Sequence, residues 1–126
     1  MDRLQTRQQL GRHQLIQAAS GEQFAGGLSP AAVGHRVVHG GSEFAGPALL
    51  NEEVIEKLAQ LVALAPQQQD CSLDMVRAVQ SMRPDLPQVA CFDTSFHRGR
   101  HPVTERYGLP NELYDAGVRR WGYHGL

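Results

Sequence analysis

The sequence predicts an α/β fold, because segments with strand character alternate along the chain with segments of helical periodicity. Two short apolar runs, Ala32–His39 and Val89–Phe92, are typical of buried strands. Between them, apolar residues recur at helical spacing. No internal repeat or linker divides the sequence, so we expect residues 1–126 to form a single domain.

The N-terminal part predicts a helix followed by the first strand. Arg3–Ala19 has a thin stripe of leucines among Arg and Gln, which indicates a weakly amphipathic helix that ends near Gly21. A glycine- and proline-containing loop follows. The valine-rich segment Ala32–His39 then predicts a strand that ends at Gly40-Gly41.

The next helix has the strongest local signals in the sequence. Asn51 is a good N-cap, and two glutamates follow it at the positive end of the helix dipole. Apolar spacing then predicts a helix over Glu52–Ala65, ended by a proline. We expect a polar loop over Gln67–Asp70. Ser72 can cap a second helix, which Pro84 stops.

The last third of the chain begins with the second strand, Val89–Phe92, which ends at Asp93. After it we expect loops through Pro110, then a short helix around Glu112–Ala116. A final strand is predicted over Val118–Tyr123. The expected order is α-β-(β)-α-α-β-α-β, in which the bracketed strand has no assigned residues.

Composition and charge narrow the class of protein. A hydrophobic share of 41% and a charged share of 20% are ordinary for a soluble domain. The formal net charge of −1 provides no basic excess for nucleic acid, and the apolar stretches are too short for a membrane span. The N-terminal segment lacks the apolar core of a secretory signal. Cys71 and Cys91 are expected to be reduced thiols in a cytoplasmic protein, and Cys91 is the better candidate for burial because it lies in an apolar run.

Arg36 and Val38 are two residues apart on the first predicted strand, so their side chains share one face of it. A guanidinium beside an apolar wall suits a small ligand with a charged end and a methyl end. The alternative is an edge-strand arginine paired with a surface carboxylate. Spacing alone favours that alternative.

Asp93 follows the second apolar run, where open α/β sheets usually bind ligands beyond the carboxyl ends of their strands. A carboxylate there can hold a metal-bound water or orient an arginine. With Thr94 and Ser95 after it, Asp93 can equally form an Asx turn or cap the next segment. Position alone does not decide between these roles.

Two histidine pairs, His35/His39 and His97/His101, have a spacing that suits zinc only on a helix. The first pair lies on a predicted strand, and a glycine and a proline beside the second pair argue against a helix. We therefore expect hydrogen-bonding histidines and no metal site. In Gly122-Tyr123-His124-Gly125, flanking glycines would let the imidazole approach a ligand closely, although chain ends tend to fray.

Together these segments resemble the acetate/propionate kinase family in their order and spacing, over residues 30–125. The blocks that carry the resemblance are Gly34-His35-Arg36-Val37-Val38-His39-Gly40-Gly41, Leu64-Ala65-Pro66, Phe92-Asp93-Thr94-Ser95-Phe96-His97 and Arg119-Arg120-Trp121-Gly122-Tyr123-His124-Gly125. The resemblance implies part of a ribonuclease-H-like lobe, the fold shared by sugar kinases and actin. It also implies phosphoryl transfer from ATP to a short-chain carboxylate, acetate giving acetyl phosphate, with magnesium.

The resemblance also implies roles for five residues. Arg36 resembles the arginine that meets the carboxylate and the transferring phosphoryl group, and Val38 resembles a wall of the methyl pocket. Asp93 resembles the catalytic aspartate, and His124 the histidine that contacts the phosphoryl group. Tyr123 falls just before that histidine, close to the acceptor site. Such a transfer needs positive groups and donors around three equatorial oxygens.

The departures from the family predict an incomplete enzyme. Family members are longer, begin with a Ser-rich phosphate-binding turn that is not seen after Asp2, and continue into Thr-Ser-His where this chain ends at Leu126. The usual Leu-His-Asn-Pro after Ala-Pro is here Gln67-Gln68-Gln69-Asp70, a change that the resemblance implies removes a histidine and part of the acceptor pocket. We therefore expect the central part of an N-terminal lobe, truncated, without the adenosine site and inactive alone.

Three alternatives to a kinase stay open at this point: a non-catalytic module that binds a partner, a gene remnant, and a small-anion binder that uses Arg36. The sequence does not distinguish acetate from propionate or butyrate as the acceptor. Without the family's first strands, the Ala32–His39 strand would lie at an unpaired sheet edge, and the helix over Glu52–Ala65 would be only partly covered. We therefore expect weak packing and self-association.

Overall fold

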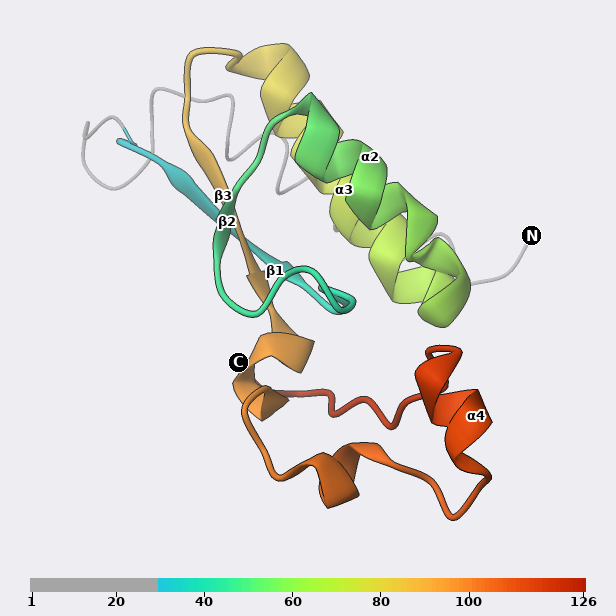
Figure 1. The fold of residues 1–126 in the computed structure, drawn as a ribbon. Helices are drawn as coiled ribbons and strands as arrows, with labels where there is room; N and C mark the ends of the chain where they lie inside the picture. The colour runs from blue at the N-terminus through green and yellow to red at the C-terminus, as the bar shows by residue number, and fades with distance from the viewer. Residues whose placement is uncertain (1–29) are drawn as a thin grey trace, which may run out of the picture.

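A three-stranded sheet lies at the centre of the computed structural model, which describes residues 30–126 (Figure 1). Its strands are β1 (Val33–Val37), β2 (Ala48–Leu49) and β3 (Gln88–Phe92), in the order β1-β3-β2. β1 runs parallel to β3, with Arg36 opposite Cys91, whereas β2 is antiparallel to β3. The helix predicted over Arg3–Ala19 lies outside the described residues.

The two predicted strands are confirmed as β1 and β3, although β1 is shorter than expected and ends at Val37. The predicted alternation of faces is also found, since His35, Val37 and His39 are buried while Arg36 is exposed. The apolar run predicted a buried Cys91, but this residue is half-buried, as is Cys71. In β3 the residues at 88, 90 and 92 are buried, which leaves Cys91 on the other face of the sheet.

Helix α2 (Glu52–Gln60) begins at the predicted residue, and the side chain of Asn51 accepts a hydrogen bond from the backbone N–H of Val54 at 2.8 Å. It ends earlier than the predicted Ala65, because the chain tightens into the 3-10 turn η2 (Val62–Leu64). The capping prediction is therefore confirmed, and the helix is shorter than apolar spacing suggested.

Helix α3 (Pro66–Met82) corrects the predicted loop over Gln67–Asp70, which is helical. Pro66 occupies the first turn of α3, where a missing N–H costs nothing, so it starts this helix as well as ending the previous pattern. Ser72 is consequently not an N-cap but lies inside α3, with its hydroxyl 3.0 Å from the carbonyl oxygen of Gln68.

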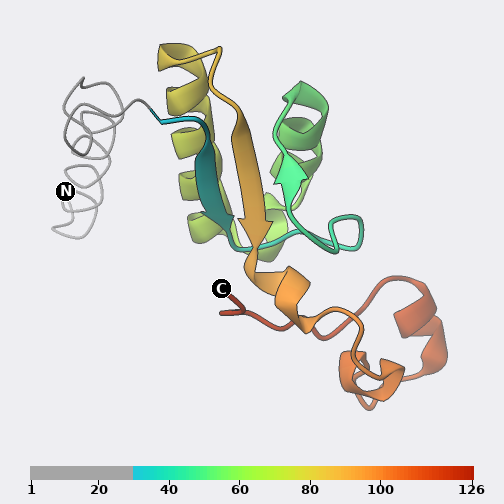
Figure 2. The same cartoon turned by 90° about the vertical axis from the view of Figure 1, so that its left-hand side faces the viewer.

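The core lies between the sheet and the two long helices. Helices α2 and α3 lie side by side over one face of the sheet (Figures 1 and 2). The buried cluster between them consists of Val37, Leu58, Leu73, Ala90 and Phe92. Within residues 30–126, no helix is long and apolar enough to cross a membrane.

Beyond the carboxyl end of β3 the chain forms short elements, drawn orange to red in Figures 1 and 2. They are η3 (Asp93–His97), η4 (Pro102–Glu105) and α4 (Asn111–Asp115). The short helix predicted near residues 112–116 is thus confirmed as α4. The strand predicted over Val118–Tyr123 is wrong, because this tail makes no strand pairing in the described sheet.

Candidate functional site

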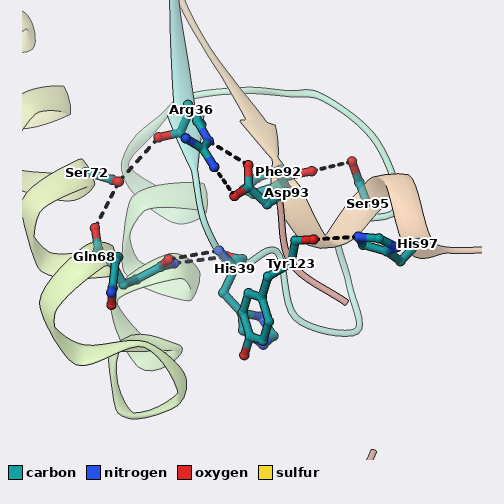
Figure 3. A network of polar contacts seen from close by, with 10 residues as sticks. Arg36, His39, Gln68, Ser72, Phe92, Asp93, Ser95, His97 and Tyr123 are labelled. Atoms are coloured by element: carbon teal, nitrogen blue, oxygen red, sulfur yellow. Dashed lines mark hydrogen bonds and ion pairs between the residues drawn. The ribbon is translucent and has the colours of Figure 1, made fainter. Parts of the chain in front are cut away.

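The parallel arrangement of β1 and β3 brings two predicted site residues to the same end of the sheet. Arg36 lies near the carboxyl end of β1, and Asp93 follows β3 directly. Figure 3 shows their side chains meeting across the gap between the two strands. Residues separated by 57 positions in the sequence are therefore neighbours in the fold.

Arg36 and Asp93 form a two-pronged ion pair. Nε of Arg36 donates to Oδ1 of Asp93 at 2.8 Å, and Nη2 donates to Oδ2 at 2.7 Å. The Asp93 side chain is 1% exposed, whereas that of Arg36 is 56% exposed. The carboxylate is thus buried behind the arginine, whose outer N–H groups face solvent. The arginine does lie on an edge strand, but its partner is not the surface carboxylate that spacing alone suggested.

The ion pair fixes the charge of Asp93. Hydrogen bonds from Arg36 hold the pKa of the Asp93 carboxyl below its ordinary value of 3.8, although burial works in the opposite direction. The backbone N–H of His124 lowers this pKa further. Asp93 is therefore a fixed anion at neutral pH, suited to holding an arginine rather than to accepting a proton.

An open cleft of about 740 Å³ brings all five predicted site residues together. Arg36, Val38 and Asp93 line it at the carboxyl ends of β1 and β3, and Tyr123 and His124 line it from the C-terminal tail. The opposite wall is η2 and the first turns of α3, which contribute Leu64, Ala65, Pro66, Gln67, Gln68, Cys71 and Ser72. The arrangement places a solvent-facing cation beside an apolar wall, which suits a small anion with an alkyl group.

The sequence missed the wall that α3 contributes. Ser72 lies 3.3 Å from the carbonyl oxygen of Arg36 and so ties α3 to β1 beside the cleft (Figure 3). Gln67 and Gln68 were predicted to lie in a loop, and the resemblance implied only that part of the acceptor pocket is lost at these positions. The available signal was Pro66, which is as typical of a helix start as of a helix end.

The C-terminal tail reaches the cleft by packing tightly against η3. A Cβ atom on Gly122 would overlap the ring of His97, and one on Gly125 would overlap the backbone oxygen of Asp93. His124, between them, has a φ of 57°, a left-handed conformation that costs free energy outside glycine. The His97 ring also hydrogen-bonds the backbone oxygen of Tyr123 at 2.8 Å. These contacts hold His124 at the cleft.

His39 supports the site from behind. Its backbone N–H donates to the side chain of Gln69 at 3.1 Å, and its carbonyl accepts from the same side chain at 3.0 Å (Figure 3). Its Nδ1 accepts from the N–H of Gly41, so the neutral ring carries its proton on Nε2. Burial lowers the pKa of His39, which therefore stays neutral at neutral pH.

The remaining histidines also act through hydrogen bonds. The buried His35 ring lies 2.7 Å from the side-chain oxygen of Gln88. His97 bonds the tail, and Nδ1 of His101 accepts from the N–H of Val103 at 3.4 Å, a weak contact. In the part of the chain from residue 30 onward, no three His, Cys, Asp or Glu side chains are grouped so that they could hold a metal ion.

Comparison with known proteins places this geometry in context. Residues 16–126 match the sequence profile of the Acetokinase family. The chain is 50% identical to the acetate kinase of Nitrobacter hamburgensis over 99 residues, which cover 79% of this chain and 24% of that protein. It is also 50% identical to the acetate kinase of Rhizobium meliloti over 100 residues, covering 79% and 25%. The chain thus spans about a quarter of the length of these curated relatives.

The fold is shared with solved structures of the same family, among them a propionate kinase and an acetate kinase. A propionate kinase from Francisella tularensis superposes with a TM-score of 0.70 at 41% identity, covering 75% of this chain and 25% of that one. The acetate kinase of Porphyromonas gingivalis gives a TM-score of 0.75 at 32% identity, covering 92% and 30%. The predicted fold class, an α/β part of a ribonuclease-H-like lobe of the actin and sugar-kinase type, is confirmed by this likeness.

Proposed function

The chain belongs to the acetokinase family, and on that premise we propose that its cleft is the acceptor side of a phosphoryl-transfer site. The reaction moves the γ-phosphoryl group of ATP to a short-chain carboxylate, with acetate giving acetyl phosphate. The observation that supports this most is the meeting of Arg36, Val38, Asp93, Tyr123 and His124 in one cleft. These residues come from three separate segments of the sequence, and a fold with an unrelated function would not be expected to bring them together.

The proposed roles follow from charge and position. A carboxylate oxygen of the acceptor forms a bond to the γ-phosphorus, while the bond from that phosphorus to the bridging oxygen of ADP breaks. Arg36 binds the acceptor carboxylate and the equatorial oxygens, and the His124 imidazole donates to the phosphoryl group. Val38 and Tyr123 surround the alkyl group. Asp93 orients the guanidinium of Arg36 through its two hydrogen bonds and keeps the charge of the pair fixed.

Magnesium and ATP enter this proposal through family membership alone. Magnesium prefers about six oxygen ligands in octahedral geometry. Asp93 is the one carboxylate that lines the described cleft, and both of its oxygens already accept from Arg36. The described residues therefore do not fit a protein-held magnesium site, and the roles above are those of the chain's own side chains.

Binding of a carboxylate by the 126-residue chain tests the proposal directly. In a proton–nitrogen NMR titration with acetate, propionate and butyrate, we expect saturable shifts at the cleft. Arg36→Ala should abolish them, Arg36→Lys should weaken them because lysine lacks the planar fork, and Arg77→Ala on the exposed side of α3 should leave them unchanged. Equal binding by the Arg36→Ala and Arg77→Ala variants would show that the cleft is not the acceptor site.

Turnover is a separate question, because the chain spans about a quarter of its relatives. We expect no acyl phosphate from ATP and acetate with this chain alone, since the cleft holds groups for the acceptor only. The measurement is a discontinuous assay for acyl phosphate with the purified chain. Turnover that disappears in the Arg36→Ala variant would contradict this part of the proposal and leave the acceptor role intact.

A further inference from the structure

A second cavity, of about 160 Å³, lies beyond the carboxyl end of β3 between η3, η4 and the C-terminal tail. Four arginines and a single carboxylate line it: Arg98, Arg100, Arg119, Arg120 and Glu105. The whole chain has a net charge of −1, so this gathering of cations is local and does not reflect a basic protein. Cations crowded at one cavity repel one another unless an anion lies among them.

Two of the four guanidinium groups are already engaged. Arg98 donates to the carbonyl of Ser42 at 2.8 Å, and Arg119 lies 3.7 Å from Glu105 and over the ring of Tyr114. The side chains of Arg100 and Arg120 have no hydrogen bond or ion pair within residues 30–126. The backbone N–H of Arg120 bonds the carbonyl of Glu105 at 2.8 Å, which fixes the tail beside η4. The cavity therefore has a defined frame and uncompensated positive charge.

His97, which lines the same cavity, has a buried polar atom. Its Nε2 carries a proton, because this nitrogen donates a hydrogen bond to the carbonyl oxygen of Tyr123. Its Nδ1 is buried and has no partner in the described structure. A buried polar atom left without a partner costs free energy, so a ligand that supplies a donor to Nδ1 is favoured.

We propose that this cavity binds a phosphate-class anion, either free inorganic phosphate or the phosphate group of a monoester. Inorganic phosphate still carries a proton at neutral pH, so it offers anionic oxygens to Arg100 and Arg120 and a P–OH donor to Nδ1 of His97. A monoester offers the same donor in its singly protonated form. Sulfate has no proton to donate at neutral pH, so the site prefers phosphate to sulfate. Arginine is the side chain best suited to such oxygens, because its planar fork can contact two of them at once.

The position of the cavity links it to the acceptor cleft. Thr94 and Gly122 line the cavity, while their sequence neighbours Asp93 and Tyr123 line the cleft. His97 connects the two, since it lines the cavity and its ring hydrogen-bonds the backbone oxygen of Tyr123. An anion bound among the arginines therefore fixes the tail that carries His124, and acetate and phosphate bind cooperatively.

Phosphorus NMR and calorimetric titration of the full chain with inorganic phosphate test the proposal. We expect saturable binding, tighter for phosphate than for sulfate. The double variant Arg100→Ala/Arg120→Ala should weaken it by at least about tenfold, because loss of even one of the two charge-assisted contacts costs about that much. The matched control Arg77→Ala, on α3, should bind as the wild type does. If glycerol phosphate displaces inorganic phosphate from the site, the ligand class is a phosphate monoester. If it does not, the ligand is free inorganic phosphate.

The cleft variant separates this inference from the proposed function. Phosphate binding that is lost in Arg36→Ala but kept in the double variant would place the anion in the cleft and overturn the inference. If the double variant fails to fold, a map of the chemical-shift changes that phosphate causes in the wild type distinguishes the two sites. Shifts at His97, Arg100 and Arg120 support the second site, whereas shifts confined to the cleft contradict it.

Discussion

At the scale of single residues, the Arg36–Asp93 pair shows why the site could be predicted only in part. The two-residue period of a strand put Arg36 and Val38 on one face, and the end of an apolar run marked Asp93. The partnership itself depends on β1 and β3 lying parallel in register, which no local pattern encodes. The family resemblance implied that Arg36 and Asp93 belong to one site, and both residues line the same cleft.

Acid should reveal the Asp93 ion pair in the stability of the chain. Because the folded pKa of Asp93 is below its ordinary value of 3.8, the pair stabilises the fold fully above that value. This contribution is lost as the pH falls through the lower, folded pKa. Urea unfolding from neutral pH downward should therefore show a gap between wild type and Asp93→Asn that closes in acid. A gap that stays constant with pH would contradict the ionised, buried carboxylate.

Gly125 should be essential to the position of the tail. An alanine Cβ would overlap the Asp93 backbone oxygen and the Phe96 side chain, so the tail must move away from η3. We expect Gly125→Ala to weaken acetate binding with little change in the unfolding midpoint. Gly108→Ala is the matched control, because open space surrounds Gly108. Equal acetate affinity in both variants, measured by NMR titration, would show that the tail does not shape the cleft.

At the scale of elements, local signals located α2 but not the start of α3. Asn51 and the acidic first turn determine α2 by themselves. Pro66 fits both the end of one helix and the first turn of the next. A tertiary contact made by Gln69 favours the helix that starts at Pro66. The side chain of Gln69 is fully buried and hydrogen-bonds both the backbone N–H and the C=O of His39, as a neighbouring strand would. The tail over Val118–Tyr123 failed as a strand for a related reason, since strand propensity forms no strand without a neighbour to pair with.

Neighbouring glutamines on α3 allow a sharp test of that contact. Gln69→Ala leaves the buried N–H and C=O of His39 without partners, and we expect it to lower the free energy of unfolding by at least about 2 kcal/mol. Gln68→Ala, one position away and exposed, should change it by less than about 0.5 kcal/mol. Urea denaturation measures both. Similar values for the two variants would mean that Gln69 does not hold β1 to α3.

At the scale of the whole molecule, the sheet is open on one side. β1 pairs only with β3 in the described sheet, so no strand is paired with its outer edge there. The face of the sheet away from the helices carries the exposed Arg36 and the half-buried Val89 and Cys91. The unpaired edge was expected from the resemblance, because longer family members have further strands. It makes an additional strand or a second copy the natural neighbour of β1.

Size-exclusion chromatography and calorimetry measure what this open edge does. We expect the purified chain to self-associate with rising concentration, or to unfold over a broad temperature range. A concentration-independent monomer with a sharp transition above about 60 °C, high for a mesophilic domain, would contradict this expectation. It would favour a self-sufficient binding module over a part of a larger kinase lobe.

The ring of Trp121 stands edge-on to the buried imidazole of His39, with centroids 4.6 Å apart, and it is the only tryptophan of the chain. The fluorescence of Trp121 therefore reports whether the C-terminal tail is packed against His39. An excited indole loses its emission to a protonated imidazole but much less to a neutral one. Because burial holds the pKa of His39 below 6.5, the fluorescence should stay bright at neutral pH and dim only in more acidic solution. Detachment of the tail removes the quencher, so a chain whose tail has come loose would lose this acid-induced dimming while remaining folded.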